Sequence, residues 1–145
     1  MYDIVVISGG FDPVHKGHVR MVKASSKLGK KLIVGVNSDA WLKRKKGKEF
    51  MTQDERLEIM QSFKGVTDAV LFDDSDNSAS ALIRKVRQLY PVEKIAFANG
   101  GDRLHDNIPE VQTCLDCKVE MVWNVGGGKV QSSSDLIANS RVAEE

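Results

Sequence analysis

The chain has 145 residues and a mass of 16.0 kDa, a size that suits one domain. Hydrophobic residues make up 41% and charged residues 28%, a balance typical of a globular protein and not of a disordered one. The formal net charge of +1 provides no general reason to expect a nucleic-acid or membrane partner. No stretch approaches the roughly 18 apolar residues of a membrane-spanning helix, and the first residues do not resemble a signal peptide, so we expect a cytoplasmic protein.

The charges are distributed unevenly along the chain. Residues 1–72 hold 13 Lys and Arg against 8 Asp and Glu, whereas residues 73–145 hold 8 against 12. We therefore expect anions to be drawn to the first half of the chain, where the basic residues are in excess.

Short apolar runs alternate with helical patterns from one end of the chain to the other. Strands are predicted over residues 4–7, 31–37, 69–72, 94–98 and 119–123. Helices are predicted over residues 17–28, from the capping box at 52–55, over 78–90, after Pro109 and from the serines at 132–134. This order implies right-handed βαβ crossovers. The predicted fold is a single α/β domain over residues 1–145, with a Rossmann-like, doubly wound sheet of about five parallel strands and helices on both faces.

The loop after the first predicted strand reads Gly-Gly-Phe-Asp-Pro-Val-His-Lys-Gly-His over residues 9–18. Its leading glycines allow a sharp turn and a close approach of the backbone to a ligand. The next helix begins near Gly17, so its free N–H groups and positive dipole end can hold phosphate. His15 and His18 lie three residues apart on one side of that first turn, where two imidazoles can donate to phosphate oxygens. The structural alternative is that one histidine caps the helix and the other is exposed. The loop matches neither the Walker A pattern nor the dinucleotide-binding pattern.

Further polar residues follow the second predicted strand. Residues 43–48 hold five cations and Gly47, and three interpretations stay open: a solvated basic loop, a nucleic-acid contact, or a mobile clamp on a triphosphate. Arg56 is expected either to orient a phosphate or to form a surface ion pair. Asp12 and Asp39 are candidate contacts to Mg²⁺ or substrate, or plain turn and helix caps.

A second glycine pair follows the fourth predicted strand, at residues 100 and 101. Its glycines allow a flat nucleoside to lie against the backbone, and Asp102 can accept hydrogen bonds from ribose hydroxyls. Arg103 is a candidate phosphate contact. The alternative is a plain turn.

Cys114 and Cys117 form a C-x-x-C pair that has too few companions for zinc. This pair closes a predicted helix instead of opening one, so we interpret both cysteines as inert thiols.

These motifs resemble those of the cytidylyltransferase-like nucleotidyltransferases. The sequence over residues 9–18 is similar to the family's His-x-Gly-His signature. Residues 36–39 with 43–47, and Gly100-Gly101-Asp102, are similar to the corresponding segments of the heptose 1-phosphate adenylyltransferases, while Ser132, Ser133 and Ser134 lie where the family has Ser-Thr-Thr. The resemblance covers about residues 3–140.

The resemblance implies transfer of a nucleotidyl group from an NTP to a small phosphate monoester, with release of pyrophosphate, no covalent intermediate, and Mg²⁺ as the usual cofactor. It implies catalytic roles for His15, His18 and Lys46, and substrate binding by Asp39, Arg56 and Lys129. The nucleotide-binding residues that it implies are Gly9, Gly10, Phe11, Asp12, Gly17, Lys43, Gly101, Asp102, Arg103, Ser132, Ser133 and Ser134.

Two departures from the family pattern bear on the nucleotide. A family arginine before the serine cluster is missing, and Lys129 stands nearby with a charge but without the bidentate fork. A second family arginine falls at Gly65, beside Lys64. We favour ATP with a sugar, polyol or amino-alcohol phosphate acceptor; CTP with a glycerol 3-phosphate type of acceptor is the alternative.

Other functional classes stay open at this point. A non-catalytic nucleotide sensor would use the same loops, although it has little need of both histidines. An RNA-binding module would use residues 43–48, but no interleaved aromatic side chains support it. We therefore expect neither a nucleic-acid nor a membrane partner, and a homodimer, common in the family, is left open.

Overall fold

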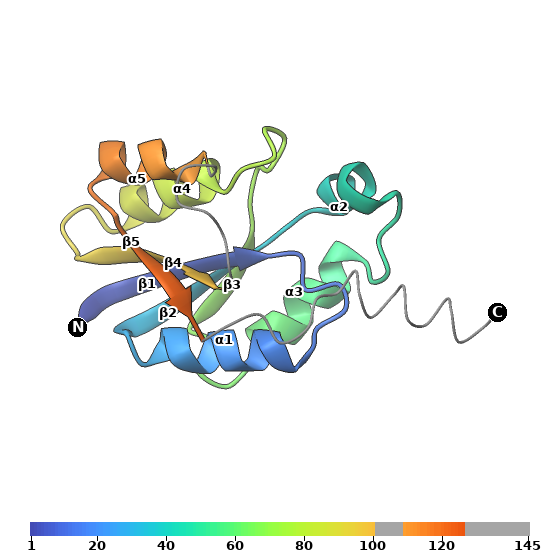
Figure 1. Ribbon diagram of the computed structural model, residues 1–145, viewed down its shortest axis with the longest axis horizontal. Coiled ribbons are helices and arrows are strands. Elements are labelled where there is room, and N and C mark those ends of the chain that lie inside the picture. Colours follow the sequence, from blue (N-terminus) through green and yellow to red (C-terminus); the bar gives the residue numbers. More distant parts are fainter. Residues whose placement is uncertain (101–108, 127–145) are drawn as a thin grey trace.

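A computed structural model describes residues 1–100 and 109–126 of the chain. The predictions on Gly101, Asp102, Arg103, Lys129, Ser132, Ser133 and Ser134, and on a last helix, fall outside these residues. One helix lies between each strand and the next, except between β2 and β3, where there are two (Figure 1). The order is β1 (Tyr2–Gly9), α1 (Lys16–Ser26), β2 (Gly29–Val36), α2 (Asp39–Lys46), α3 (Gln53–Gln61), β3 (Asp68–Leu71), α4 (Ser80–Leu89), β4 (Ile95–Gly100), α5 (Glu110–Cys117) and β5 (Glu120–Val125).

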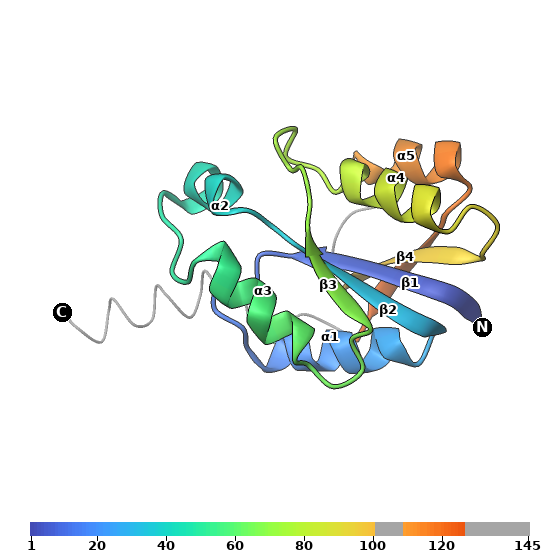
Figure 2. The same cartoon turned by 180° about the vertical axis from the view of Figure 1, so that it is seen from behind.

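All five strands are parallel and form one sheet in the order β3-β2-β1-β4-β5. The chain moves outward from β1 through β2 to β3 and then returns to the centre, so that β4 pairs with the other side of β1. Helices α1 and α3 cover one face of the sheet and α4 and α5 cover the other, as the two opposite views show (Figures 1 and 2). This arrangement confirms the predicted Rossmann-like, doubly wound α/β fold. The strand order reverses between β1 and β4, and ligands of such sheets bind beyond the carboxyl ends of the strands at that point.

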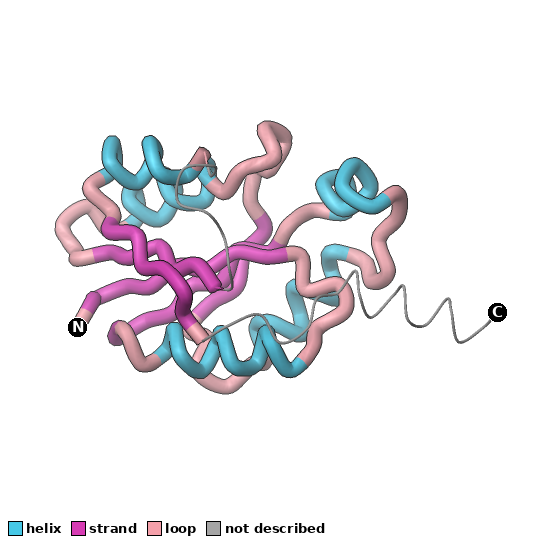
Figure 3. The backbone as a smooth tube through the Cα atoms, viewed as in Figure 1, coloured by secondary structure: helices cyan, strands magenta, loops and turns pink. Residues whose placement is uncertain are grey.

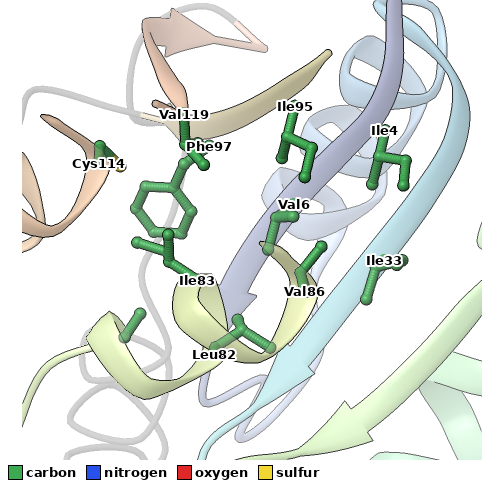
Figure 4. Close-up of a cluster of buried hydrophobic side chains, with 11 residues drawn as sticks. Ile4, Val6, Ile33, Leu82, Ile83, Val86, Ile95, Phe97, Cys114 and Val119 are labelled. Atoms are coloured by element: carbon green, nitrogen blue, oxygen red, sulfur yellow. The ribbon is translucent and has the colours of Figure 1, made fainter. Parts of the chain in front are cut away.

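The alternation of side chains along each strand divides the core into two layers. Ile4 and Val6 of β1 face α4 and α5, where they pack in one cluster with Leu82, Ile83, Val86 and Phe97 (Figure 4). The intervening residues Val5 and Ile7 face the opposite way and pack with Val22 of α1 and Met60 of α3. Both faces of the central strand are therefore buried, which is the physical reason for the unbroken apolar run at residues 4–7 in the sequence.

One predicted segment differs in the structure. The basic run after β2 was expected to be a loop, but its first part forms helix α2, which stands apart from both helical layers (Figure 3). Ser38 caps the helix by accepting a hydrogen bond from the backbone N–H of Trp41, and Gly47 ends it with a positive φ of 88°. Four of the cations lie in its last turn, where they interact favourably with the negative end of the helix dipole. The loop prediction was wrong because the weak apolar pattern concealed a short helix with good caps at both ends.

Helix α5 ends at the C-x-x-C pair, as predicted. Both cysteines are free thiols, and Cys114 is buried. Burial, with smaller contributions from Cys117 and Glu110, raises the pKa of Cys114 to about 12, so this thiol stays protonated and unreactive near neutral pH. Among the described residues, none of the helices is long and apolar enough to cross a membrane.

Candidate active site

The site is built around the loop that joins β1 to α1, at the carboxyl end of the central strand. Two glycines precede Phe11, which has a positive φ of 53°, an uncommon conformation for a residue with a side chain. A Cβ on Gly9 would lie 3.1 Å from the Phe11 ring, and a Cβ on Gly10 would lie 3.1 Å from Cδ2 of Leu42 in α2. We expected these glycines to admit a ligand. The structure shows that the space beside these glycines is taken by side chains of the protein itself, Phe11 of the same loop and Leu42 of α2.

His15 and His18 cap helix α1 together. The Nδ1 of His15 accepts a hydrogen bond from the backbone N–H of Gly17 at 3.0 Å, and the Nδ1 of His18 accepts one from the backbone N–H of His15 at 3.1 Å. Their rings stack with centroids 3.9 Å apart. Two N–H groups that a helix start leaves without partners are satisfied in this way, so both histidines serve as caps, and neither is the isolated surface residue of the structural alternative.

This capping also determines which ring nitrogen carries the proton. A nitrogen that accepts a hydrogen bond has no proton of its own, so each neutral imidazole holds its proton on Nε2, across the ring from the backbone that it caps. Burial lowers the pKa of His15, and burial together with the neighbouring His15 lowers the pKa of His18 to about 4. Near neutral pH the pair therefore presents two neutral Nε2–H donors, which can bind an anionic oxygen without a proton transfer.

Asp12 and Lys46 form the wall of the site between the loop and α2. The Asp12 carboxylate is buried and accepts hydrogen bonds from the backbone N–H groups of Phe50 and Met51, both at 2.6 Å. The ammonium of Lys46 lies 3.1 Å from the same carboxylate and donates to the backbone carbonyl of Asp12 at 2.6 Å. Lys46, at the C-terminal end of α2, is thereby brought to the loop that carries the histidines, although 34 residues separate it from Asp12. Asp12 connects the two segments.

Arg56 occupies a different place from the one expected. We predicted a phosphate contact or a surface ion pair, but its side chain is fully buried. The guanidinium donates to the backbone carbonyls of Gly10, Asn37 and Met51 and to the carboxylate of Asp39, at 2.9, 2.6, 2.9 and 2.8 Å. Four of the five N–H donors of an arginine are used by the protein itself. The prediction of a surface ion pair was therefore wrong: the pair with Asp39 exists, but its Arg56 side chain is fully buried and its Asp39 side chain is only 25% exposed.

Lys43 lies in the same helix as Lys46 but outside this network. Its side chain is 59% exposed and its ammonium is 3.8 Å from Glu49. The structure thus separates two lysines that the sequence placed in one run: Lys46 contacts the β1–α1 loop, and Lys43 faces solvent.

One residue that supports the site was not predicted from the sequence. Asp74, buried in the loop after β3, accepts hydrogen bonds from the backbone N–H and hydroxyl of Ser38 at 2.8 and 2.7 Å and from the side-chain amide of Asn37 at 3.1 Å. Arg44 of α2 donates to the backbone carbonyl of Asp74 at 2.9 Å. This loop therefore holds both ends of the basic helix. The run Asp-Asp-Ser-Asp-Asn over residues 73–77, shortly after β3, is typical of a structured turn and is the signal that would have found this residue.

The described residues do not form a metal cage of their own. Within residues 1–100 and 109–126 no group of three or more His, Cys, Asp and Glu side chains is arranged to hold a metal ion. Both oxygens of Asp12 are occupied by backbone N–H groups, one of them also by Lys46, and one oxygen of Asp39 accepts from Arg56. A divalent cation here would need most of its ligands from a bound substrate, which is how Mg²⁺ is commonly held beside nucleotide phosphates.

A helix N-terminus with two neutral imidazole donors and a lysine, at the carboxyl edge of a doubly wound parallel sheet, defines a Rossmann-like protein that binds nucleotides or other phosphates. Comparisons with known proteins are more specific. Residues 6–138 match the family described as cytidylyltransferase-like, and the chain belongs to this family. The chain is 40% identical over 142 residues to bifunctional protein HldE of Azorhizobium caulinodans, a match that covers 95% of this chain and 27% of that protein.

Solved structures of nucleotidyltransferases share this fold. A bifunctional NMN adenylyltransferase/ADP ribose pyrophosphatase from Francisella tularensis superposes with a TM-score of 0.71 at 16% identity, over 99% of this chain and 43% of that one. A second structure under that name, complexed with AMP and a manganese ion, superposes with a TM-score of 0.68 over 96% of this chain and 41% of that one, also at 16% identity. At this identity the likeness concerns the fold. The chain spans about a quarter of the length of the curated relatives that it matches.

Proposed function

We propose that residues 1–145 form a single nucleotidyltransferase domain, which transfers a nucleotidyl group from an NTP to a small phosphate monoester and releases pyrophosphate. Membership of the cytidylyltransferase-like family supports the reaction class. The observation in the structure that carries the proposal is the pair of Nδ1-capped histidines, because it presents two fixed Nε2–H donors at the start of a helix. We favour ATP and a sugar, polyol or amino-alcohol phosphate, a choice that the similarity to HldE supports.

The reaction needs positioning and charge stabilisation more than proton transfer. An oxygen of the acceptor phosphate attacks the α-phosphorus, the new P–O bond forms, and the bond to the β-phosphate oxygen breaks, so that pyrophosphate leaves with the bonding electrons. The acceptor is already an anion, and no general base is required. His15 and His18 donate from Nε2 to the oxygens on which negative charge grows, and the N–H groups of the first turn of α1 and the ammonium of Lys46 add positive potential.

We propose that a divalent cation, Mg²⁺ by preference, accompanies the nucleotide. The AMP and manganese complex of the Francisella protein supports the choice of a divalent ion. The cation would neutralise phosphate charge, with the nucleotide phosphates as its main ligands, because the described carboxylates near the histidines already have partners. The nucleotide roles of Gly101, Asp102, Arg103 and the serine cluster, the role of Lys129, a homodimer and a cytoplasmic location stay predictions.

The test is a grid of pyrophosphate release assays with Mg²⁺. ATP, CTP, GTP and UTP are each combined with hexose and heptose 1-phosphates, glycerol 3-phosphate, phosphocholine, phosphoethanolamine, nicotinamide mononucleotide and phosphopantetheine. We expect release in one combination, reduced by about 10²- to 10³-fold in His18→Ala. Val19→Ala, at the next position of α1 with an exposed side chain, is the matched control and is expected to retain full activity.

Three outcomes would change or contradict the proposal. Release with CTP and glycerol 3-phosphate would favour the cytidylyltransferase alternative. NTP binding detected by calorimetry without release in any combination would favour a nucleotide sensor. If the protein neither binds nor turns over an NTP, the nucleotidyltransferase proposal and the sensor alternative are both contradicted.

A further inference from the structure

Arg56 is the largest fully buried side chain among the described residues, and its contacts are unusual for a residue expected to bind substrate. The guanidinium joins the loop after β1, the end of β2 and the segment before α3 through the carbonyls of Gly10, Asn37 and Met51. The remaining contact, to Asp39, balances its charge at the start of α2. A phosphate that bound to Arg56 directly would have to displace some of these partners and reach a side chain with no exposed surface.

The contact of Arg56 with Gly10 lies directly before a residue of unusual backbone conformation, Phe11. Phe11 has a left-handed φ of 53°, a conformation that costs free energy and persists only where the surrounding structure holds it. The two carbonyls on either side are both held by cations: Arg56 binds the carbonyl of Gly10 at 2.9 Å, and Lys46 binds that of Asp12 at 2.6 Å. Arg56 therefore holds the peptide plane directly before Phe11, and Lys46 holds the plane that follows Asp12. The ring of Phe11 is itself buried and packs closely against Gly9.

The ring of Phe11 contacts His18, one of the two histidines of the site. The Phe11 ring is 4% exposed and meets the ring of His18 edge to face, with centroids 5.0 Å apart and planes inclined by 71°. His18 also stacks on the ring of His15, with the two centroids 3.9 Å apart. His18 therefore contacts both rings, and its contact with Phe11 depends on a backbone conformation that Arg56 helps to maintain.

We infer that Arg56 is a positioning residue, which orients His18 through the carbonyl of Gly10 and the ring of Phe11 and does not bind the substrate phosphate. The inference rests on the proposed function for its effect on turnover, but its structural part, the coupling of Arg56 to His18, stands on the contacts alone. Asp39 belongs to the same support, since its carboxylate pairs with Arg56.

The test compares Arg56→Lys and Arg56→Met with a matched control, Arg87→Lys. Arg87 also donates to backbone carbonyls, those of Cys117, Tyr90, Glu93 and Lys118, and it lies in α4, away from the histidines. For each variant the titration of the His18 imidazole is followed by NMR in the free protein, NTP affinity is measured by calorimetry, and KM and kcat are measured separately.

We expect Arg56→Lys to stay folded, to raise the titration midpoint of His18, to lower kcat by about 10- to 100-fold, and to change NTP affinity by less than about threefold. Arg87→Lys is expected to leave the His18 titration and kcat unchanged. A loss of NTP affinity with an unchanged His18 titration would show that Arg56 is a phosphate ligand and overturn the inference. Lower thermal stability with the His18 titration and kcat unchanged would show a structural role only, and would also overturn it.

A second variant keeps the inference testable if Arg56 substitutions do not fold. Phe11→Leu removes the ring and leaves Arg56 in place, and it is expected to shift the His18 titration in the same direction. No shift in Phe11→Leu would contradict the proposed route. If the unmodified protein shows no turnover with any substrate while Arg56→Lys still shifts the His18 titration, the proposed function fails and the positioning role is retained.

Discussion

The Nδ1 of His18 accepts the backbone N–H of His15 at 3.1 Å while the two imidazole rings stack 3.9 Å apart. One nitrogen of each ring is thus used to cap the helix, and the proposed function assigns the other, Nε2, to the ligand. This division between capping and donation can be tested because side-chain amides reproduce one nitrogen of histidine at a time.

His15→Asn is expected to separate the two roles of the first histidine. The amide oxygen of asparagine can replace Nδ1 as the cap, and asparagine is among the best capping residues, but nothing replaces the Nε2 donor. Activity should fall by about 10²- to 10³-fold at unchanged stability. His15→Ala, which loses the cap as well, should in addition cost about 1 kcal/mol of unfolding free energy. Urea denaturation and pyrophosphate release assays measure the two effects; equal stability of the two variants would contradict the capping role.

Stability is expected to depend on pH through His18. Its pKa in the folded protein is lowered to about 4 from the ordinary value of 6.5, so the unfolded chain binds the proton more tightly. The stabilisation is complete above about pH 6.5 and is lost as the pH falls from there toward 4, with a total of about 3 kcal/mol as an upper value. Urea denaturation at about pH 7 and pH 5, on either side of the ordinary pKa, should show a larger loss for the unmodified protein than for His18→Asn. The same loss in both would assign the pH dependence to other groups.

Lys46 and Lys43 provide a comparison within one helix. Lys46→Met removes a partner from the buried carboxylate of Asp12, which keeps its two backbone N–H donors, so we expect a loss of about 1–3 kcal/mol and a strong reduction in turnover. Lys43→Met removes an exposed contact with Glu49 at 3.8 Å and should change stability by less than about 1 kcal/mol. Thermal unfolding and steady-state kinetics of both variants provide the check. A larger effect of Lys43 on both measures would reverse the assignment.

The two cysteines are expected to react differently. Because burial raises the pKa of Cys114 to about 12, almost none of this thiol is ionised at about pH 8, and its side chain is buried. Iodoacetamide at that pH should therefore modify Cys117 first and leave Cys114 unmodified in the folded protein, with both modified in urea. Peptide mass spectrometry identifies the labelled residue, and early labelling of Cys114 would contradict an inert, buried thiol.

Local patterns were sufficient to predict most of the fold. The run at residues 4–7 is apolar on every residue because β1 is covered on both faces, and in a chain of alternating elements such a run indicates a buried parallel strand. The capping box beginning at Thr52 located the start of α3, where Thr52 accepts a hydrogen bond from the backbone N–H of Glu55. Helix α2 was missed because it is short and mostly basic, with a single buried residue, Leu42, and so has no apolar stripe that would reveal a helical period.

The sequence by itself determined the five strands, the described helices other than α2, and the place of the histidine loop, because each depends on a pattern among residues close together along the chain. The parallel arrangement followed from the alternation of strands with connecting helices. Only the tertiary structure decided which groups the basic side chains of Lys46 and Arg56 contact. Lys46 reaches Asp12 and Arg56 reaches the carbonyl of Gly10 across 34 and 46 positions of the sequence. No local pattern predicts such pairings, since an arginine bound to phosphate and an arginine bound to three backbone carbonyls have the same sequence neighbours. The difference lies in which groups the folded sheet brings within hydrogen-bonding distance and removes from water.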